Sequence, residues 1–201
     1  MDMLTKSKNK RAWQRMLSGR RLDILFPSPL DIEIEDIAQG LSRVARWNGQ
    51  TIGKYSFSVA EHSLLVERIF SSFFANPQKK WQLSCLLHDS SEYVIGDMIS
   101  PFKNSIGGEY RKVEKDLLDS IHLRFNLPTK IPHGIKSKIK KADKIAAFIE
   151  ATQLAGFSIN EAKSLFCNPN PCFLEIKITS SKPSKTKKKF LERFFDLYKN
   201  L

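Results

Sequence analysis

The sequence predicts an all-α protein, a helical bundle with little or no β-structure. Apolar residues recur at helical spacing along most of the chain, in the segments 37–44, 62–73, 81–92, 113–121, 139–147 and 190–201. Only residues 173–178 alternate between apolar and polar side chains as a short strand does. The chain has 201 residues, which is enough for one domain with a core of its own.

Most of the net charge of +12 lies at the two ends of the chain. Residues 1–21 carry seven lysines and arginines against one aspartate, and residues 182–201 carry seven against two acidic residues. The 160 residues between them hold 19 basic and 18 acidic side chains, so the body is almost neutral. We interpret the ends as solvated tails that also attract phosphate-bearing ligands, and we do not expect a nucleic acid as partner.

The cysteines and the hydropathy indicate the compartment. Cys85, Cys167 and Cys172 are odd in number, and Cys85 lies on an apolar helix face, where a free thiol behaves as a small hydrophobe. No apolar run approaches the roughly 18 residues that cross a bilayer, and no hydrophobic segment follows the basic start as in a signal peptide. We therefore expect a cytoplasmic protein without membrane contact.

The start of the chain divides at about residue 21. Residues 1–21 are expected to form a basic N-terminal segment, and residues 22–201 the folded domain. Within the first segment, Trp13, Met16 and Leu17 predict one short helix that ends at Gly19.

Arg46 and Trp47 are expected at the end of the next helix, whose apolar stripe begins at Ile37 and which Asn48-Gly49 would terminate. A guanidinium binds phosphate as a fork, and an indole offers a flat face to a base or sugar. The pair therefore suits a nucleotide, although a surface arginine beside a core tryptophan has the same spacing.

A histidine faces inward near the start of the following helix. Residues 58–61, Ser-Val-Ala-Glu, form a capping box that predicts the helix start. His62, Val66, Ile69 and Phe73 then share one stripe. A single inward histidine is also typical of a core residue bonded to a backbone carbonyl.

A second inward histidine belongs to the stripe of Trp81, Cys85, His88 and Glu92, which predicts one continuous helix. Asp89 adjoins His88, so an imidazole and a carboxylate can turn toward one cation. Two ligands are too few for a metal site, and the others must come from elsewhere in the chain.

Asp143 is a third side chain that could bind a metal from an inward helix face. Residues 109–125 and 135–154 both read as amphipathic helices, and Asp143 lies on the inward face of the second one, beside alanines and an isoleucine. Burying it unpaired would cost several kcal/mol, so it needs a cation or strong donors. A salt bridge with a lysine such as Lys140 is the alternative.

The chain ends in a helix expected at about residues 184–200. Its apolar stripe must be buried, either on its own domain or across the two-fold axis of a homodimer. The stripe consists of Phe194, Phe195, Tyr198 and Leu201, preceded by either Phe190 or Leu191.

Taken together, these residues resemble the H...HD...D signature of HD-domain metal-dependent phosphohydrolases, with His62, His88-Asp89 and Asp143 in its positions. The sequence has no glycine-rich phosphate loop, no GxSxG and no paired CxxC. Four blocks in order resemble the bacterial 5'-deoxynucleotidase branch (YfbR-like) and place the HD core at about 38–155. They are residues 58–63, 88–92, 96–103 and 109–115.

The resemblance implies an all-helical HD-domain bundle with a metal site in its centre, and it implies roles for eight residues. One divalent ion, Mn, Co, Zn, Fe or Mg, would be bound by His62, His88, Asp89 and Asp143. Glu92 and Asp97 would orient the attacking water and protonate the leaving oxygen, and Arg46 and Trp47 would line the nucleotide pocket. Because His122 and His133 lie outside the motifs, a site for one metal is favoured over a site for two.

We therefore expect a hydrolase that removes phosphate from nucleoside 5'-monophosphates, with deoxy forms preferred, and that forms a homodimer as the resembled family does. A deoxynucleoside triphosphate triphosphohydrolase is the first alternative, because related enzymes use the same site. A basic nucleic-acid-binding protein and a non-catalytic helical domain are the others.

Overall fold

Helices make up most of the chain, and the predicted all-α fold class is confirmed. This computed structural model describes residues 12–99, 102, 103, 105, 108–199 and 201. In that part of the chain the only sheet has two strands. No helix among the described residues combines the length and the apolarity that crossing a membrane requires.

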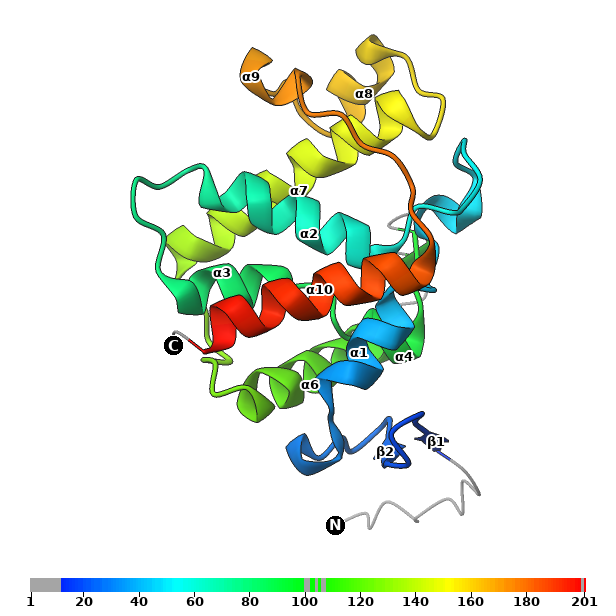
Figure 1. Cartoon of the computed structure of the whole chain (residues 1–201), viewed down its shortest axis with the longest axis vertical. Coiled ribbons are helices and arrows are strands. Elements are labelled where there is room, and N and C mark those ends of the chain that lie inside the picture. The colour runs from blue at the N-terminus through cyan, green and yellow to red at the C-terminus, as the bar shows by residue number, and fades with distance from the viewer. Residues whose placement is uncertain (1–11, 100–101, 104, 106–107, 200) are drawn as a thin grey trace.

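The bundle is formed by helices of very different length (Figure 1). The main ones are α1 (Ile34–Leu41), α2 (Val59–Ser71), α3 (Lys79–Leu86), α4 (Glu92–Ile95), α6 (Gly108–Arg124), α7 (His133–Gln153) and α10 (Pro183–Tyr198). The shorter helical segments are η1 (Pro29–Asp31), η2 (Arg46–Gly49), α8 (Ile159–Leu165) and α9 (Pro171–Leu174).

Helix α2 lies in the middle of this arrangement. It packs against α7 and α3, while α10 crosses α1, α2 and α3 (Figure 1). One apolar cluster combines α1, α3, α6 and α10 with the start of α2, and a second combines the rest of α2 with α7 and α8. Because α2 contributes to both clusters, His62 on this helix is fully buried.

Residues 13–23 form a β-hairpin, so the short helix predicted before Gly19 is wrong. Strand β1 (Trp13–Arg15) pairs antiparallel with β2 (Arg21–Asp23). Gly19 in the connection has a φ of 92°, a conformation that suits chain reversal. Met16 and Leu22, in the connection and in β2, are buried in the apolar cluster formed with the helices. One turn of helix would have fixed several residues for very few hydrogen bonds, which is why so short a stretch rarely nucleates.

The starts and lengths of α2, α6 and α7 agree with the sequence prediction. The capping box before α2 is present, because Ser58 Oγ accepts from the backbone N–H of Glu61 at 3.3 Å and Glu61 Oε2 accepts from that of Ser58 at 2.9 Å. Helix α6 begins at Gly108 and α7 at His133, each within two residues of the expected start.

Two predicted helices end earlier than expected. Helix α1 ends at Leu41, and the segment 46–49 is a separate η2 in which Trp47 and Asn48 have positive φ values of 57° and 49°. The helix expected through residues 81–92 ends at Leu86, and a series of turns separates it from α4. His88 and Glu92 therefore do not share one helix face.

The strand expected at residues 173–178 is also wrong. Helix α9 covers the start of that range, with Asn170 Oδ1 accepting from the backbone N–H of Cys172 at 3.1 Å and Pro171 at the first helical position. Asparagine before proline is a strong helix start, and it prevails over a short alternation of side chains.

Helix α10 docks onto its own chain. Phe190, Phe194 and Leu197 are buried, and Arg193 binds both carboxylate oxygens of buried Glu67 on α2, at 2.7 and 2.9 Å. The stripe therefore contributes to the intramolecular core. Phe195, at 37% exposure, lies at its edge. The homodimer stays a prediction.

Candidate metal centre

The rings of His62 and His88 lie close together, with centroids 5.3 Å apart, and in each ring Nε2 is the nitrogen without a hydrogen bond to the described residues. His62 projects from α2, and its Nδ1 lies 2.6 Å from Oε1 of Glu150. His88 stands in the turn after α3, and its Nδ1 lies 2.9 Å from the carbonyl oxygen of Cys85. A carbonyl oxygen only accepts hydrogen bonds, as does an ionised carboxylate, so Nδ1 carries the proton in both rings. In a neutral ring, Nε2 is then a bare lone pair.

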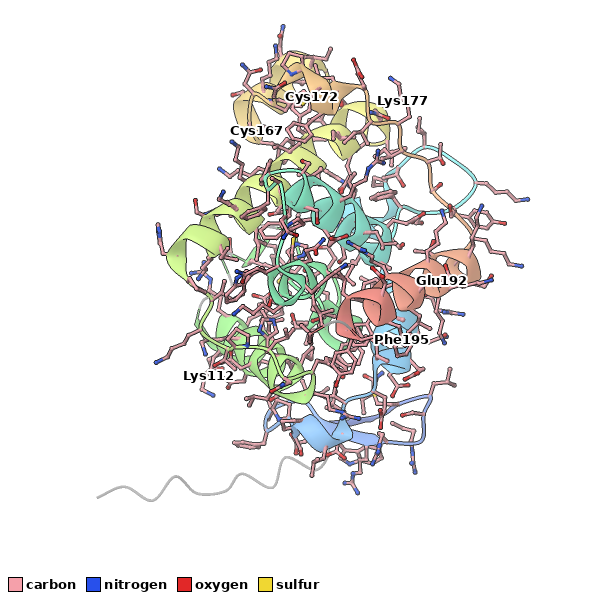
Figure 2. The ribbon with its side chains drawn as sticks, turned by 60° about the vertical axis from the view of Figure 1, so that its left-hand side comes forward. Lys112, Cys167, Cys172, Lys177, Glu192 and Phe195 are labelled. Carbon is pink, nitrogen blue, oxygen red and sulfur yellow. The ribbon has the colours of Figure 1, made fainter. Side chains whose placement is uncertain are left out.

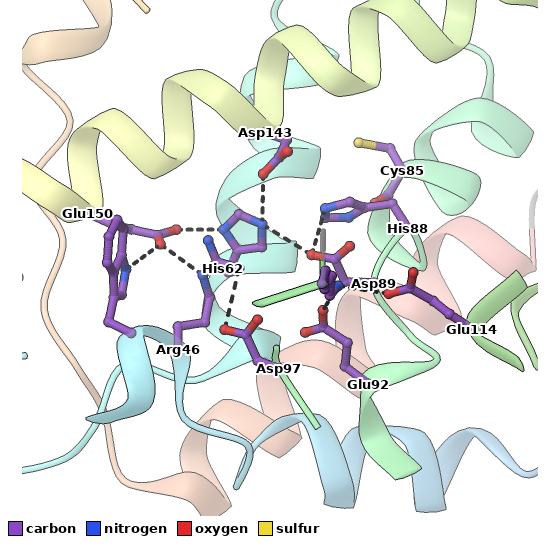
Figure 3. Close-up of polar contacts among 12 residues, drawn as sticks. Arg46, His62, Cys85, His88, Asp89, Glu92, Asp97, Glu114, Asp143 and Glu150 are labelled. Atoms are coloured by element: carbon purple, nitrogen blue, oxygen red, sulfur yellow. Dashed lines mark hydrogen bonds and ion pairs between the residues drawn. The ribbon is translucent and has the colours of Figure 1, made fainter. Parts of the chain in front are cut away.

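Two carboxylates face these nitrogens (Figure 3). Asp143 Oδ1, from α7, lies 3.3 Å from His62 Nε2. Asp89 Oδ2 lies 3.5 Å from His62 Nε2 and 3.1 Å from His88 Nε2. The candidate ligand atoms of His62, His88 and Asp143 all lie within 4.8 Å of one another. Within the described part of the chain, neither Nε2 makes a hydrogen bond, although both are buried.

This cluster of lone pairs and anions requires a positive charge. Burial and the nearby Arg46 favour a neutral His62, but the surrounding carboxylates outweigh them and raise the pKa of this imidazole well above its ordinary value. Burial also opposes ionisation of Asp89, yet the two histidines hold its pKa well below the usual range. A divalent ion satisfies the same demand, since borderline metals accept mixed nitrogen and oxygen donors. His62, His88 and Asp143 could therefore hold a metal ion, with Asp89 beside them.

Glu150 orients His62 and has three donors around it. This fully buried carboxylate lies on α7 and accepts from Arg46 Nε at 2.9 Å and from Trp47 Nε1 at 3.0 Å, in addition to His62 Nδ1. Burial alone would raise the pKa of Glu150, but Arg46, His62 and the hydrogen bonds lower it to about 2. The carboxylate is therefore ionised and fixes the ring and the tautomer of His62.

A second acidic pair lies on the other side of Asp89. Glu92 is buried, with Oε1 at 3.3 Å from Lys103 Nζ and Oε2 without a hydrogen-bond partner among the described residues. Burial, reinforced by the charges of Asp89 and Asp97, raises the pKa of Glu92 to about 9. Burial also raises the pKa of Asp97, although Arg46 Nη1, at 3.9 Å, opposes the shift. At neutral pH, Glu92 thus carries a proton.

The uncharacterized protein RCAP_rcc00048 of Rhodobacter capsulatus is 52% identical to this chain over 195 residues, which are 96% of this chain and 98% of the relative. The chain belongs to the same family as that protein. The uncharacterized protein YfdR of Escherichia coli is 28% identical over 124 residues, 62% of each of the two chains. No family model matches the chain.

The structure brings all eight predicted site residues to one region, but two have different neighbours from those expected. The Nε atom of Arg46 is engaged by Glu150. The indole of Trp47 packs against Phe157 and Phe166, with ring centroids 5.7 and 5.8 Å apart. The pair thus supports His62 through Glu150. Arg46, with a side chain 14% exposed, is not a surface arginine, and contact of the pair with a nucleotide stays a prediction.

The sequence argument missed Glu150 and Lys103. Glu150 lies seven positions after Asp143, on the same inward face of α7, so a second acidic residue in that apolar stripe was a signal that could have revealed it. Lys103 Nζ is 2.8 Å from Glu114 Oε1 as well as close to Glu92. No helical or strand periodicity relates Lys103 to its partners. His122 is buried against the carbonyl oxygen of Pro128, as a structural histidine would be.

Proposed function

We propose that this protein is a metal-dependent phosphohydrolase of the HD-domain type that removes phosphate from (deoxy)nucleoside 5'-monophosphates. The observation that carries the proposal is the meeting of two buried Nε2 atoms, on His62 and His88, which have no hydrogen-bond partner among the described residues, with the carboxylates of Asp89 and Asp143. The ordered sequence blocks around these residues support the HD assignment.

The donor set fits one divalent cation. Each histidine has its Nδ1 engaged by an acceptor, and each Nε2 faces carboxylate oxygens 3.1 to 3.5 Å away. Such a cation would supply a Lewis acid and a bound water whose pKa falls from about 15.7 toward roughly 7 to 9. His62, His88, Asp89 and Asp143 would hold it. Binding of the ion would displace the proton on Nε2 of His62, because a ligand nitrogen must be unprotonated. The proton on Nδ1 stays in the hydrogen bond to Glu150.

Glu92 is suited to protonate the leaving 5'-oxygen. Burial and the nearby carboxylates raise its pKa to about 9 without a metal, and its buried Oε2 has no hydrogen-bond partner among the described residues. A general acid needs a pKa near or above the working pH and a proton that points at the substrate. Lys103, beside Oε1, would limit the pKa rise and contribute positive charge near a phosphate.

Asp97 and Arg46 would act together next to Glu92. Asp97 Oδ2 lies 3.9 Å from Arg46 Nη1, so the guanidinium holds this carboxylate near the site, where it can orient the attacking water. Arg46 has its Nε occupied by Glu150, and only its Nη atoms remain to contact a substrate phosphate. The packing of Trp47 favours a supporting role over base stacking.

A panel of nucleoside mono-, di- and triphosphates tests the proposal, with metal-free protein reloaded with Mn, Co, Zn or Mg. Inorganic phosphate from a deoxynucleoside monophosphate is the expected product. Release of tripolyphosphate from a triphosphate would instead support the triphosphohydrolase. If no metal binds and no phosphate is released, the site is non-catalytic. Salt-sensitive binding to nucleic acid, lost on removal of residues 1–21 and 182–201, would support the basic binding protein.

A further inference from the structure

A cavity of about 340 Å³ lies on α7, away from the metal centre. Lys140, Lys141 and Lys144 form its wall on α7, and Asn168 and Asn170 line the side that leads into α9. None of the residues that line it belongs to the metal centre. Its volume lies within the range of roughly 300 to 1,000 Å³ that is typical of small-molecule sites.

The lysines of this wall have no carboxylate to neutralise them. None of the residues lining the cavity is acidic, and none of the three ammonium groups makes an ion pair within the described part of the chain. Elsewhere, Lys112 and Lys115 each pair with an aspartate four positions later. On α7, Lys140 is instead followed four positions later by Lys144, a repulsive spacing on a helix.

The opposite wall offers neutral donors. Asn170 uses its Oδ1 to cap α9, and its side-chain NH₂ group, which makes no hydrogen bond within the described part of the chain, can donate to a ligand in the cavity. Phe173 and buried Ile145 add apolar surface. Cys167 also lines the cavity, where burial raises the pKa of its thiol while Lys144 and Lys141 oppose that rise. The charges of Lys141 and Lys144 therefore act on the thiol of Cys167.

We propose that this cavity binds a small phosphate-bearing anion through Lys140, Lys141 and Lys144, with the amide of Asn170 as a further donor. Ammonium groups act as point charges for phosphate, and a compact polyanion relieves the repulsion among three of them. The ligand is either an inorganic polyphosphate or a phosphate ester such as a nucleotide. The inference does not depend on the proposed phosphohydrolase function.

The alkylation rate of Cys167 reports occupancy of the cavity directly. Cys172, exposed and outside the cavity lining, provides the reference in the same molecule (Figure 2). Metal-free protein is treated with uncharged iodoacetamide, with and without tripolyphosphate, and each cysteine is followed by peptide mass spectrometry. Tripolyphosphate is expected to slow the reaction of Cys167 at least threefold and to leave Cys172 unchanged.

Two double variants with the same change in charge test the assignment. The protection should disappear in Lys140→Ala/Lys144→Ala and persist in Lys130→Ala/Lys136→Ala, whose lysines are exposed and do not line the cavity. An unchanged Cys167 rate, equal protection in both variants, or equal slowing by sodium chloride at the same ionic strength would overturn the proposal. Protection at lower concentration by a deoxynucleoside triphosphate than by tripolyphosphate would identify a nucleotide as the ligand, and the reverse order an inorganic polyphosphate.

Discussion

Replacing Glu150 with glutamine separates the support of the metal centre from the ligands themselves. The carboxylate is fully buried and accepts from Arg46 Nε, Trp47 Nε1 and His62 Nδ1 at 2.9, 3.0 and 2.6 Å. Glutamine keeps the shape but loses the charge, and its NH₂ group must point at one of these donors. All four candidate ligands stay in place. A change in metal affinity would then come from the orientation and basicity of His62.

The expected magnitudes follow from these contacts. Removing a partner that holds a metal-ligating histidine costs about 10- to 100-fold in affinity, or roughly 1.4 to 2.7 kcal/mol. Leaving a buried guanidinium without its carboxylate costs about 3 to 5 kcal/mol of unfolding free energy. Arg46 Nη1 still faces Asp97 at 3.9 Å, so we expect the lower end of that range. Glu150→Ala should cost more, because a cavity is added.

Glu67→Gln is the matched control for this experiment. Glu67 is also buried and also bound by an arginine, Arg193, but it lies outside the metal centre. Chemical unfolding should show a loss of stability in both variants, smaller in Glu67→Gln because Arg193 keeps Asp196 as a partner at 2.6 Å. Calorimetric titration with Co²⁺ should show a loss of affinity in Glu150→Gln alone. Metal affinity of Glu150→Gln within twofold of the wild type, or an equal loss in Glu67→Gln, would refute the reasoning.

Three further predictions concern the ligands, the proton of Glu92 and the last helix. Asp89→Ala should lose bound metal and activity, measured by elemental analysis and phosphate release, while remaining helical by circular dichroism. The control Glu192→Ala, which removes an exposed carboxylate of α10, should retain bound metal and activity (Figure 2). Full activity of a metal-free Asp89→Ala protein would exclude the mechanism. Because the pKa of Glu92 rises from 4.5 to about 9 on folding, the folded state retains this proton and the unfolding free energy falls as pH increases between these values. The metal-free Glu92→Gln protein should therefore melt at a higher temperature than the wild type at pH 8, and an equal or lower melting temperature contradicts the assigned protonation. Phe194→Asp should unfold the chain, since Phe194 is buried in the core, whereas Phe195→Asp should leave a folded protein. A Phe194→Asp protein that stays folded but dissociates in sedimentation would instead place the contact of Phe194 between subunits.

The helices that the sequence predicted well have either a clear start or a long apolar stripe. The capping box of Ser58 and Glu61 and the long stripe of α7 are local signals, and the structure contains both. The end of α3 at Leu86 has no such local signal in the sequence. The stripe continues through it, and the turn is formed by His88 Nδ1 on the Cys85 carbonyl and by Ser90 Oγ on the Leu87 carbonyl at 2.6 Å. Such side-chain bonds compete with the helix without changing its apolar period.

The candidate site shows the same division. Helical periodicity is enough to predict two inward histidines and an aspartate on an inward helix face, and the resemblance joined them with Asp89 into one set. The roles of Arg46 and Trp47 depended on their orientation instead. Trp47 has a positive φ of 57°, which is uncommon outside glycine, and this turn directs its indole N–H to Glu150. No spacing in the sequence predicts that conformation.

The central claim is that one divalent ion, held by two histidines and two aspartates, makes this protein a phosphohydrolase. A titration of activity against bound metal tests it most directly: metal-free protein receives increasing equivalents of Co²⁺ or Mn²⁺, and phosphate release from a deoxynucleoside monophosphate is measured at each point. We expect no release without metal, a linear rise, and a plateau at one ion per chain. Absence of phosphate release at every ratio, or activity that is independent of added metal, would contradict the claim.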